Sequence, residues 1–276
     1  YYPDGSIKSY SDNGAAVSFT YDNLRRITSE TRSGEGTTTY TYDKFGNMAS
    51  KTSGGVSVRY SYDKNNRLLS AAETNGDITD IVNYTYDANG NMLSSSSAES
   101  EDSETAGRNA GYYSYDGWNR LTSFTSGGIT AAYVYNGDNL RQRKTVTENG
   151  VSKTVTHAYD GMNVAYESDG TNESSFIRGN NLISTVSGSD KKYYILNHRG
   201  DVVGLFNSKR QVTSNYNFDA FGNQKTNTAD SNPFRYCGEY YDNETGFIYL
   251  RNRYYDPSIG RFTTEDPAKD GDNWYA

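Results

Sequence analysis

The sequence has little cysteine and little proline, with one cysteine and four prolines among its 276 residues. A single cysteine, Cys237, cannot form an internal disulfide, so a scaffold held together by disulfides is excluded. We expect Cys237 to be a small buried side chain rather than a nucleophile, because an isolated cysteine usually packs like a hydrophobic residue. Four prolines are too few for a proline-rich disordered tract.

Long apolar runs are also missing. No run approaches the ~18–20 residues that a membrane-spanning helix needs, so we expect no membrane span. The first residues, Tyr1 to Gly5, lack the basic and then apolar pattern of a secretion signal and look like the middle of a repeat. We therefore expect the chain to be part of a longer protein.

Aliphatic residues are scarce while tyrosine is abundant. Leu, Ile, Val and Phe together are 43 of the 276 residues, below the one-fifth level that usually signals disorder, yet the chain has 27 tyrosines. A buried tyrosine ring hides a large apolar area but its hydroxyl needs a partner. Tyrosine must therefore supply much of the core in thin layers, and a globule with a thick aliphatic centre is excluded.

Charge and histidine content exclude several functions. The net charge is -7, with acidic and basic residues interspersed and no basic stripe, which disfavours nucleic-acid binding. His157 and His198 have no ligand spacing around them, so we expect no metal site. No phosphate loop, dinucleotide fingerprint or Ser-His-Asp pattern occurs, and we expect no cofactor.

A Tyr-Asp pair recurs along the chain, with start-to-start spacings of 20 to 29 residues when the variant Tyr135-Asn136 is counted. The pairs are Tyr21-Asp22, Tyr42-Asp43, Tyr62-Asp63, Tyr86-Asp87, Tyr115-Asp116 and Tyr159-Asp160. Such a period indicates a repeat architecture in which each unit buries its apolar face against its neighbours.

Each repeat has the pattern of a β-hairpin. Val82, Tyr84 and Tyr86 alternate with polar residues, a period of two that places them on one face of a strand. Turn formers follow, as in Ala88 to Asn91, and the preceding Asp can bond back to the backbone in an Asx-turn. The sequence therefore predicts antiparallel hairpins in which the repeat aspartates cap turns rather than catalyse.

The pattern divides the chain into two regions. Residues 1–180 form the hairpin array, and its Ser-rich stretch Ser94–Gly111 is expected to be a flexible surface insertion. Residues 181–276 follow a different pattern, with three strands expected before the turn unit at Phe218. The triplet Arg199-Gly200-Asp201 resembles an integrin ligand, but its context predicts a turn between strands.

A long motif follows in residues 232–267. Its members are Gly238, Tyr241, Asp242, Gly246, Tyr249, Arg253, Tyr255, Asp256, Pro257, Gly260, Arg261, Phe262, Asp266 and Pro267. This segment resembles the Rhs repeat-associated core domain, and the upstream hairpins resemble the YD repeats of the same family. That family includes Rhs proteins, wall-associated WapA-type toxins, the C components of Tc toxin complexes and animal teneurins.

The resemblance implies an all-β strip of antiparallel hairpins that curves into part of a hollow shell. In the toxin members the shell encloses a C-terminal toxin, which would be the partner in cis, and the core domain closes one end. Nothing in this chain resembles the toxin itself. The resemblance also implies a bacterial protein that is secreted or attached to the cell surface or cell wall.

Self-cleavage is a further property of some relatives, which are thought to use paired aspartates of the core as an aspartic-protease-like site. Asp256 and Asp266, with Arg253, are the candidates here, since two nearby carboxylates split their pKa values into one acid and one base. The self-cleaving relatives carry Arg-Asp where this chain has Arg253-Tyr254. The alternative is that both aspartates cap turns before Pro257 and Pro267.

Three hypotheses follow. The first is a structural shell fragment of a polymorphic toxin, which the resemblance favours. The second is a module that binds cell-surface carbohydrate or protein through exposed tyrosines. The third is a self-cleaving core domain. Tyrosine hydroxyls packed into the sheet would favour the first hypothesis, and an exposed cluster of rings would favour the second.

Overall fold

The computed structural model describes residues 1–12, 14–97, 110–226, 230–271 and 273–276. Within these ranges the one helical element is the 3-10 turn η1 (Tyr236–Gly238), and the other regular elements are 24 strands. The predicted all-β class of antiparallel hairpins is confirmed. The chain forms two compact units, Tyr1–Gly111 with Thr264–Ala276, and Tyr112–Thr263.

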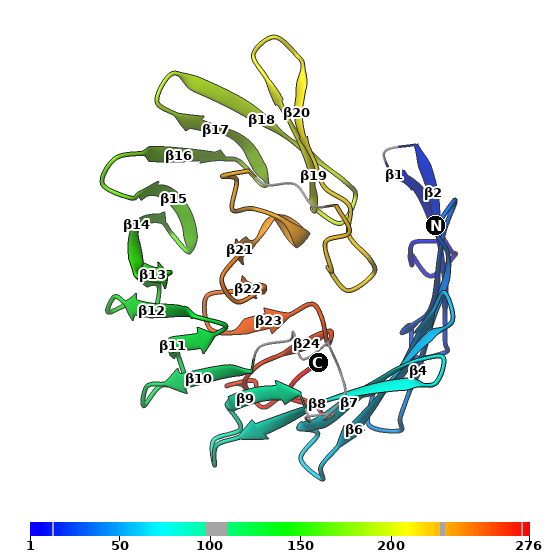
Figure 1. The fold of residues 1–276 in the computed structure, drawn as a ribbon. Helices are drawn as coiled ribbons and strands as arrows, with labels where there is room; N and C mark the ends of the chain where they lie inside the picture. The colour runs from blue at the N-terminus through cyan, green and yellow to red at the C-terminus, as the bar shows by residue number, and fades with distance from the viewer. Residues whose placement is uncertain (13, 98–109, 227–229, 272) are drawn as a thin grey trace. The chain divides into compact units, whose positions relative to one another are not determined.

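The first unit contains nine strands, each antiparallel to the next along the chain (Figure 1). They are β1 (Ser9–Asp12), β2 (Ala15–Tyr21), β3 (Ile27–Arg32), β4 (Gly36–Tyr42), β5 (Met48–Ser53), β6 (Val56–Tyr62), β7 (Leu68–Asn75), β8 (Ile78–Tyr86) and β9 (Met92–Ser97).

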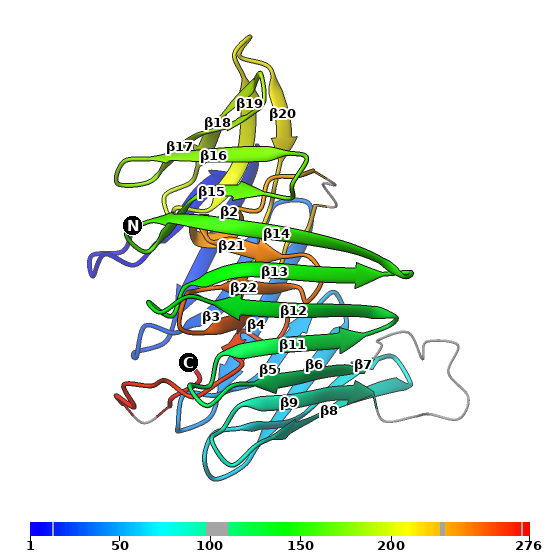
Figure 2. The ribbon, with the colours of Figure 1, turned by 90° about the vertical axis from the view of Figure 1, so that its left-hand side faces the viewer.

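The second unit contains a longer succession of hairpins, seen side by side in Figure 2. Its strands are β10 (Gly111–Tyr115), β11 (Leu121–Ser126), β12 (Ile129–Tyr135), β13 (Arg141–Glu148), β14 (Val151–Asp160), β15 (Asn163–Ser168), β16 (Glu173–Arg178), β17 (Leu182–Ser187), β18 (Asp190–Leu196), β19 (Val202–Asn207) and β20 (Val212–Asn215). From β11 to β20, each strand is antiparallel to the one before it.

A separate four-stranded sheet, here called the core-motif sheet, carries most of the predicted core motif. Its strands are β21 (Tyr240–Asp242), β22 (Phe247–Tyr249), β23 (Tyr254–Asp256) and β24 (Arg261–Phe262). Ring contacts join it to the hairpins of the same unit, stacked between Tyr113 and Phe247 and tilted between Tyr133 and Tyr254. The core of the second unit lies between these two layers.

Burial alternates along the repeat strands, as the period of two predicts. In β2, Val17 and Phe19 are buried while Ser18 and Thr20 are exposed. The exposed face carries pairs of hydroxyl side chains across neighbouring strands, such as Thr41 with Ser50 at 2.7 Å. One face of such a hairpin is therefore mainly apolar and aromatic, and the other is mainly polar. Strand β3 is an exception, because it buries Glu30 and Arg32.

The hairpin turns follow the Tyr-Asp pairs as predicted, with one exception. Strands β2, β4, β6, β8 and β10 each end on the tyrosine of the pair, and the next strand begins six residues later. Tyr159 and Asp160 instead lie inside β14, because a short turn at Gly161 and Met162 joins β14 directly to β15. Gly161 has a φ of +58°, which permits this tight connection.

Two predictions about the segments change. The stretch from residue 181 to the turn unit at Phe218 holds four strands, β17 to β20, so the expectation of three strands was wrong. The fourth, β20, is short and its Val212 is exposed, so its sequence looks like that of a loop between strands. Ser94 to Ser97 belong to β9 and Gly111 to β10, and residues 98–109 of the expected insertion lie outside the described residues. The predicted boundary between residues 180 and 181 falls inside the second unit and stays a prediction about sequence pattern.

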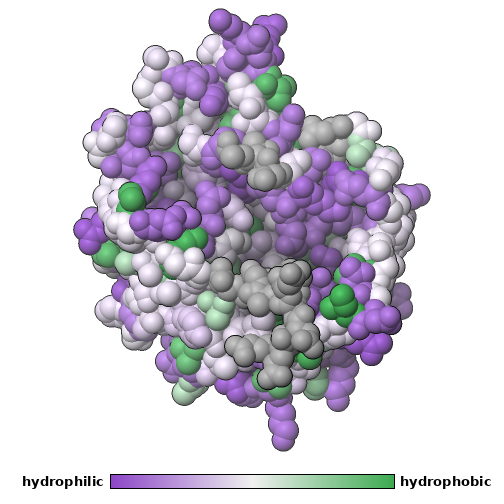
Figure 3. Space-filling model, viewed as in Figure 1, coloured by the Kyte–Doolittle hydropathy of each residue, from purple (hydrophilic) through white to green (hydrophobic). Residues whose placement is uncertain are grey.

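The surface is mostly polar. Figure 3 shows a largely hydrophilic face on which hydrophobic residues form small separate patches. The most exposed apolar side chains include turn residues such as Trp118 and Leu24, at 75% and 73%. In the described ranges, no helix has the length and hydropathy that crossing a bilayer requires.

Candidate functional site

The aspartate of each Tyr-Asp pair holds the turn that follows it. Asp63 Oδ1 accepts the backbone N–H groups of Asn65 and Arg67 at 2.8 and 2.9 Å, and its Oδ2 accepts the Arg67 Nε–H at 2.6 Å. The two backbone contacts recur at Asp22, Asp43, Asp87 and Asp116, whereas the Oδ2 of Asp43 and of Asp87 accepts from an asparagine Nδ2 instead. The repeat aspartates are therefore turn-capping residues, as the Asx-turn pattern predicts.

The tyrosine of each pair links its hairpin to the previous one. Tyr62 Oη donates to the backbone carbonyl of Met48 at 2.8 Å, and Tyr42 Oη donates to that of Ile27 at 2.8 Å. Tyr21, Tyr135 and Tyr159 donate in the same way to earlier hairpins. The rings pack inside the sheet while the hydroxyls bond its backbone, which is the arrangement that favours a scaffold over an exposed binding surface.

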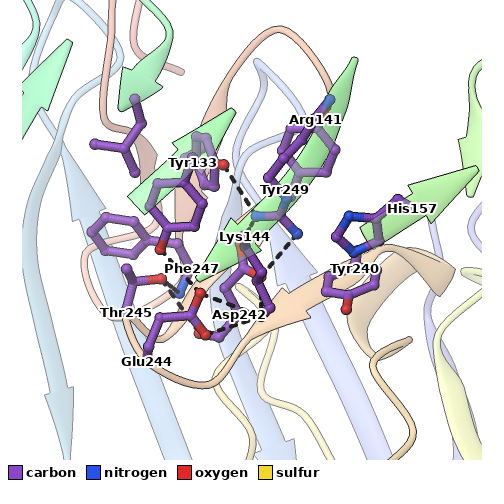
Figure 4. Close-up of polar contacts among 12 residues, drawn as sticks. Tyr133, Arg141, Lys144, His157, Tyr240, Asp242, Glu244, Thr245, Phe247 and Tyr249 are labelled. Carbon is purple, nitrogen blue, oxygen red and sulfur yellow. Dashed lines mark hydrogen bonds and ion pairs between the residues drawn. The ribbon is translucent and has the colours of Figure 1, made fainter. Parts of the chain in front are cut away.

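One hairpin of the second unit departs from this apolar pattern and carries buried charge. Arg141 begins β13, where the equivalent residues of other hairpins are Met48, Leu68, Met92 and Leu121. Lys144 lies three residues later, in the inward position that Ala71 and Phe124 occupy in their own strands. Both cations point toward the core-motif sheet (Figure 4).

The core motif supplies the opposite charges. The Arg141 guanidinium forms a two-pronged pair with Asp242, with Nη1 on Oδ2 and Nη2 on Oδ1. Lys144 Nζ lies 2.8 Å from Asp242 Oδ1 and 3.0 Å from Glu244 Oε2. We call Arg141, Lys144, Asp242 and Glu244 the charge cluster; its formal charges sum to zero and all four side chains are almost completely buried.

Tyrosines surround the charge cluster and bond several of its polar atoms. The Arg141 guanidinium lies over the rings of Tyr249 and Tyr240, at 4.4 and 5.1 Å from their centroids. Tyr249 Oη accepts the Arg141 backbone N–H at 2.8 Å, and Tyr254 Oη accepts Arg141 Nη1–H at 3.1 Å. Tyr133 Oη donates to Glu244 Oε1 at 3.0 Å. The cluster is buried and closely packed, and among the described residues Arg141 Nε is left without a hydrogen-bond partner.

The electrostatics of the cluster keep Asp242, Lys144 and Arg141 charged. Burial opposes ionisation of Asp242, but Arg141 and Lys144 outweigh it and hold the pKa of that carboxyl below its usual range. Burial also disfavours the charged form of Lys144, and Asp242 with Glu244 reverses this and raises its pKa. A buried pair of this kind is fragile, because losing one partner leaves the other charge without compensation.

His157, on β14, lies at the margin of the cluster and stays neutral. Its ring meets the Tyr240 ring edge-on at 5.3 Å, and its Nε2 is 4.0 Å from Glu167 Oε2, too far for a hydrogen bond. Burial, with Arg141 and Lys144 nearby, lowers the pKa of His157 to about 3. Burial raises the pKa of Glu167, although the hydrogen bond from Tyr240 at 2.8 Å opposes this.

The charge cluster was missed by the sequence analysis, apart from Asp242 as a motif member. Aligning the hairpins by their turns would have revealed it, because Arg141 and Lys144 stand where other repeats have apolar residues. Their partners could not be read from the sequence, since Arg141 and Asp242 are 101 positions apart. The cluster can fasten the core motif to the hairpins, but its groups are already paired with one another, which leaves it unsuited to chemistry.

The core motif is spread over both units. Gly238 lies in η1, Tyr241 and Asp242 in β21, Gly246 in the following turn, Tyr249 in β22, Arg253 just before β23, Tyr255 and Asp256 in β23, Pro257 and Gly260 in the next turn, Arg261 and Phe262 in β24, and Asp266 with Pro267 in the segment of the first unit. The motif thus marks the core-motif sheet and the segment that follows it.

The candidate catalytic residues make local contacts. Asp256 Oδ1 accepts the N–H and the hydroxyl of Ser258 at 2.9 and 2.6 Å, and Asp266 Oδ1 accepts the N–H of Ala268 at 2.8 Å. These are turn-capping contacts. Asp256 belongs to the second unit and Asp266 to the first, so a catalytic pair stays a prediction. The Arg253 guanidinium stacks on Phe262 at 3.6 Å.

Tyr254 occupies the position where self-cleaving relatives carry aspartate, and it is a structural residue here. It is 3% exposed, and its hydroxyl contacts Arg141 and the hydroxyl of Tyr135, the latter at 3.1 Å. A phenol held in this way cannot serve as the second carboxylate of an acid–base pair.

Two further motif residues are placed by the structure. Cys237 is exposed, so its expected burial was wrong: a φ of +53° in η1 turns it outward. Desolvation of its sulfur, with the nearby Asp201 carboxylate, raises the pKa of Cys237 to about 11, which keeps the thiol protonated. Asp201 of the Arg-Gly-Asp triplet is fully buried, pairs with Arg199 and accepts the backbone N–H of Cys237, so it is not displayed as a ligand.

Neither unit presents a metal centre in its described residues: no three His, Cys, Asp or Glu side chains there gather as a ligand group.

Comparisons with known proteins agree with this architecture. The profile of the family described as Teneurin YD-shell matches residues 6–273. The chain is 36% identical over 176 residues to the tRNA3(Ser)-specific nuclease WapA of Bacillus spizizenii and to the tRNA nuclease WapA of Bacillus subtilis. Each match covers 58% of this chain and 7% of the relative.

A solved structure shares the fold. The crystal structure of TcdB2-TccC3-Cdc42 superposes with a TM-score of 0.51 and 17% identity, over 95% of this chain and 18% of that chain. The described chain therefore corresponds to a small part of the relatives it matches. Because the family profile spans nearly all of its length, the chain belongs to the teneurin YD-shell family of Rhs/YD-repeat proteins.

Proposed function

We propose that this chain is a structural part of the shell of a bacterial polymorphic toxin, and that the shell encloses a toxin domain that this chain does not contain. The observation that carries the proposal is the wall-like construction of the hairpins, in which tyrosine hydroxyls bond the backbone of the neighbouring repeat. Secretion, and a cell-wall or cell-surface location, belong to the same proposal.

Two findings support this role. The relatives that match are named as tRNA nucleases, although the matched region is only 7% of their length. That proportion fits a scaffold region carried beside an active domain. In addition, the charged residues that the core motif contributes are used to fasten the core-motif sheet to the hairpins, not to build a reactive centre.

The binding hypothesis has less support. Most repeat tyrosines are buried or half-buried, whereas a carbohydrate site of the kind considered above would need a cluster of exposed rings. Exposed aromatic residues such as Tyr112 and Trp118 are isolated examples, at 57% and 75%.

Limited proteolysis of the full-length gene product tests enclosure. The C-terminal domain should resist protease in the intact protein and be cut when it is prepared alone. It should also become sensitive when Arg141→Met breaks the charge cluster and loosens the core motif. Equal cleavage of the domain in the intact protein and in isolation would contradict enclosure.

A further inference from the structure

A segment from the far end of the chain docks on the repeat turns of the first unit. This segment, residues 264–276, is called the tail segment here; it packs with residues 1–111. Tyr275 is fully buried, its hydroxyl donates to the Gly90 carbonyl at 2.7 Å, and its ring meets Tyr86 edge-on at 5.9 Å. Tyr275 therefore makes the same kind of contact as a repeat tyrosine, although 185 positions separate the partners.

A second side chain of the tail segment reaches another turn. Asn273 Nδ2 donates to Asn47 Oδ1 at 2.8 Å, and Asn47 Nδ2 donates in turn to Asn66 Oδ1 at 2.9 Å. Asn47 is fully buried. Asn273 Oδ1 also accepts the N–H of Tyr275 at 3.1 Å, which fixes the two docking side chains relative to each other.

The tail segment is closed on itself, so it is built to dock as one piece. The Asp266 N–H donates to the Trp274 carbonyl at 2.8 Å, and Lys269 pairs with Glu265 at 3.3 Å and lies over the Trp274 ring at 4.8 Å. Its contacts with the turns are made by a few side chains and not by a strand ladder.

One glycine of these turns, Gly90, lies directly against the tail segment. A Cβ on Gly90 would lie 2.4 Å from the Glu265 carboxylate, so the Glu265 side chain would have to move away from its present place against this turn. Gly46 has the same place in its own turn and nearly the same φ, +84° against +82°, but a Cβ there would meet nothing within 4 Å. Two equivalent glycines thus differ only in their relation to the tail segment.

We infer that the turns 43–47 and 87–91 form a specific peptide-binding site for the Asn-Trp-Tyr side of the tail segment, which docks and undocks while the hairpins stay folded. The ligand class is a short peptide with an asparagine two residues before a tyrosine. The site is polar and narrow, and recognises an amide and a phenol hydroxyl. This inference does not depend on what the shell encloses.

The test removes the two docking side chains of the tail segment and then adds this segment as a separate peptide. In the chain carrying Asn273→Ala and Tyr275→Ala, the site should be empty and should bind a fluorescent peptide of residues 264–276 saturably. The unchanged chain should bind this peptide at least about tenfold more weakly, because its own segment competes at high effective concentration. A peptide with phenylalanine in place of Tyr275 should bind about fivefold more weakly, for the loss of one hydrogen bond.

Two glycines provide a control. Adding Gly90→Ala to the freed chain should weaken peptide binding, while adding Gly55→Ala should lower stability by a similar amount and leave binding in place, because Gly55 also has a positive φ, lies outside both turns of the site and would place its Cβ in open space. Absence of saturable binding to the folded, freed chain would overturn the inference, as would equal loss with both glycine variants.

Hydrogen exchange covers the case in which the freed chain does not fold. In the unchanged chain, the Asp266 amide should exchange faster than the amides of β8 and β9, and Tyr275→Phe should accelerate Asp266 alone. If Asp266 exchanges only together with those strands, the segment is not separable from the hairpins and the inference is wrong.

Discussion

The hairpin tyrosines and the core-motif tyrosines both bury a hydroxyl, but they bond different parts of the chain. Tyr42 and Tyr62 donate to carbonyls 15 and 14 positions earlier, within the repeat array. Tyr249 and Tyr254 contact Arg141, 108 and 113 positions away, inside a cluster of buried charge. The first arrangement is local, repeated and tolerant of loss, while the second is single and joins distant segments. A single substitution in the repeat array should therefore lower the free energy of unfolding only slightly, whereas a single substitution in the charge cluster should lower it by a large amount.

The largest expected effect is at Asp242. Asp242→Asn would leave Arg141 and Lys144 buried with one carboxylate between them, and should cost about 3–5 kcal/mol of the free energy of unfolding. The matched control is Asp63→Asn in a repeat turn, which should cost less than about 1 kcal/mol because asparagine already caps the turns at Asn136 and Asn197. Urea denaturation followed by circular dichroism measures both.

A double variant shows whether uncompensated charge is the cause. Arg141→Met with Asp242→Leu removes both charges, places methionine where Met48 and Met92 stand in other repeats, and leaves the pair between Lys144 and Glu244. Most of the stability lost in Asp242→Asn should return. Equal instability of the double variant would mean that packing, and not charge, sets the cost.

The next effect is a dependence of stability on pH that His157, at the margin of the charge cluster, should produce. The pKa of His157 falls from 6.5 to about 3 on folding, so between these values the unfolded chain binds a proton that the folded chain does not. The free energy of unfolding should therefore decrease as the pH falls from about 6.5 toward 3, by an amount on the order of a few kcal/mol. Glu167 acts in the opposite sense, because its raised pKa lets the folded chain take up a proton first.

His157→Phe isolates this contribution. Phenylalanine keeps the edge-on contact with Tyr240 and cannot be protonated, so the slope of stability against pH between 6.5 and 4 should become shallower. Phe176→Leu supplies the control, because it disturbs a buried ring contact with Phe234 without changing a titratable group, so it should lower stability at every pH and leave the slope largely as it is. Urea midpoints at several pH values decide between them, and an unchanged slope in His157→Phe would place the acid sensitivity elsewhere.

The same contrast explains what the sequence could predict. The hairpins, their turns and the role of Asp22, Asp63 and Asp116 were readable because each contact is local and each is repeated. The bond of Tyr62 to the previous hairpin follows from the same logic, since a buried hydroxyl in a thin layer must reach an edge. Because the repeat recurs, one physical argument about a turn or a hydroxyl predicts the structure at many positions.

The charge cluster and the exposure of Cys237 were not readable, for two different reasons. Arg141 and Asp242 are brought together by a chain path that the sequence pattern does not reveal, although a cation in an apolar repeat position was a usable signal. The backbone at Cys237 has a φ of +53°, and a left-handed conformation cannot be predicted from the presence of a cysteine.

A smaller effect compares one hydroxyl from each region. Tyr249→Phe leaves the buried N–H of Arg141 without its acceptor and should cost about 1–3 kcal/mol. Tyr62→Phe removes a donor from the Met48 carbonyl at the half-buried edge of a hairpin and should cost about 0.5–1.5 kcal/mol. Both variants keep the ring, so a difference in unfolding free energy reports the hydroxyl alone. A larger cost for Tyr62→Phe would reverse the proposed ranking of the two regions.

The smallest effect lies in a repeat turn and should be stabilising. Arg25 has a φ of +63° in the turn position that glycine or asparagine fills in the other Tyr-Asp hairpins, as at Gly46 and Asn66. A left-handed conformation costs an ordinary residue about 1–2 kcal/mol, and glycine adopts it freely but loses more entropy on folding. Arg25→Gly should therefore raise the free energy of unfolding by about 0.5–1 kcal/mol. The ion pair of Arg25 with Asp4, at 3.6 Å and largely exposed, contributes little against this gain.

Arg25→Ala separates the two contributions, because alanine also removes the ion pair but keeps the strained φ. Thermal unfolding should place Arg25→Gly above the unchanged chain and Arg25→Ala at or below it. If alanine stabilises as much as glycine, backbone strain is not the cause, and the turns of the repeat array are more permissive than their Asx geometry implies.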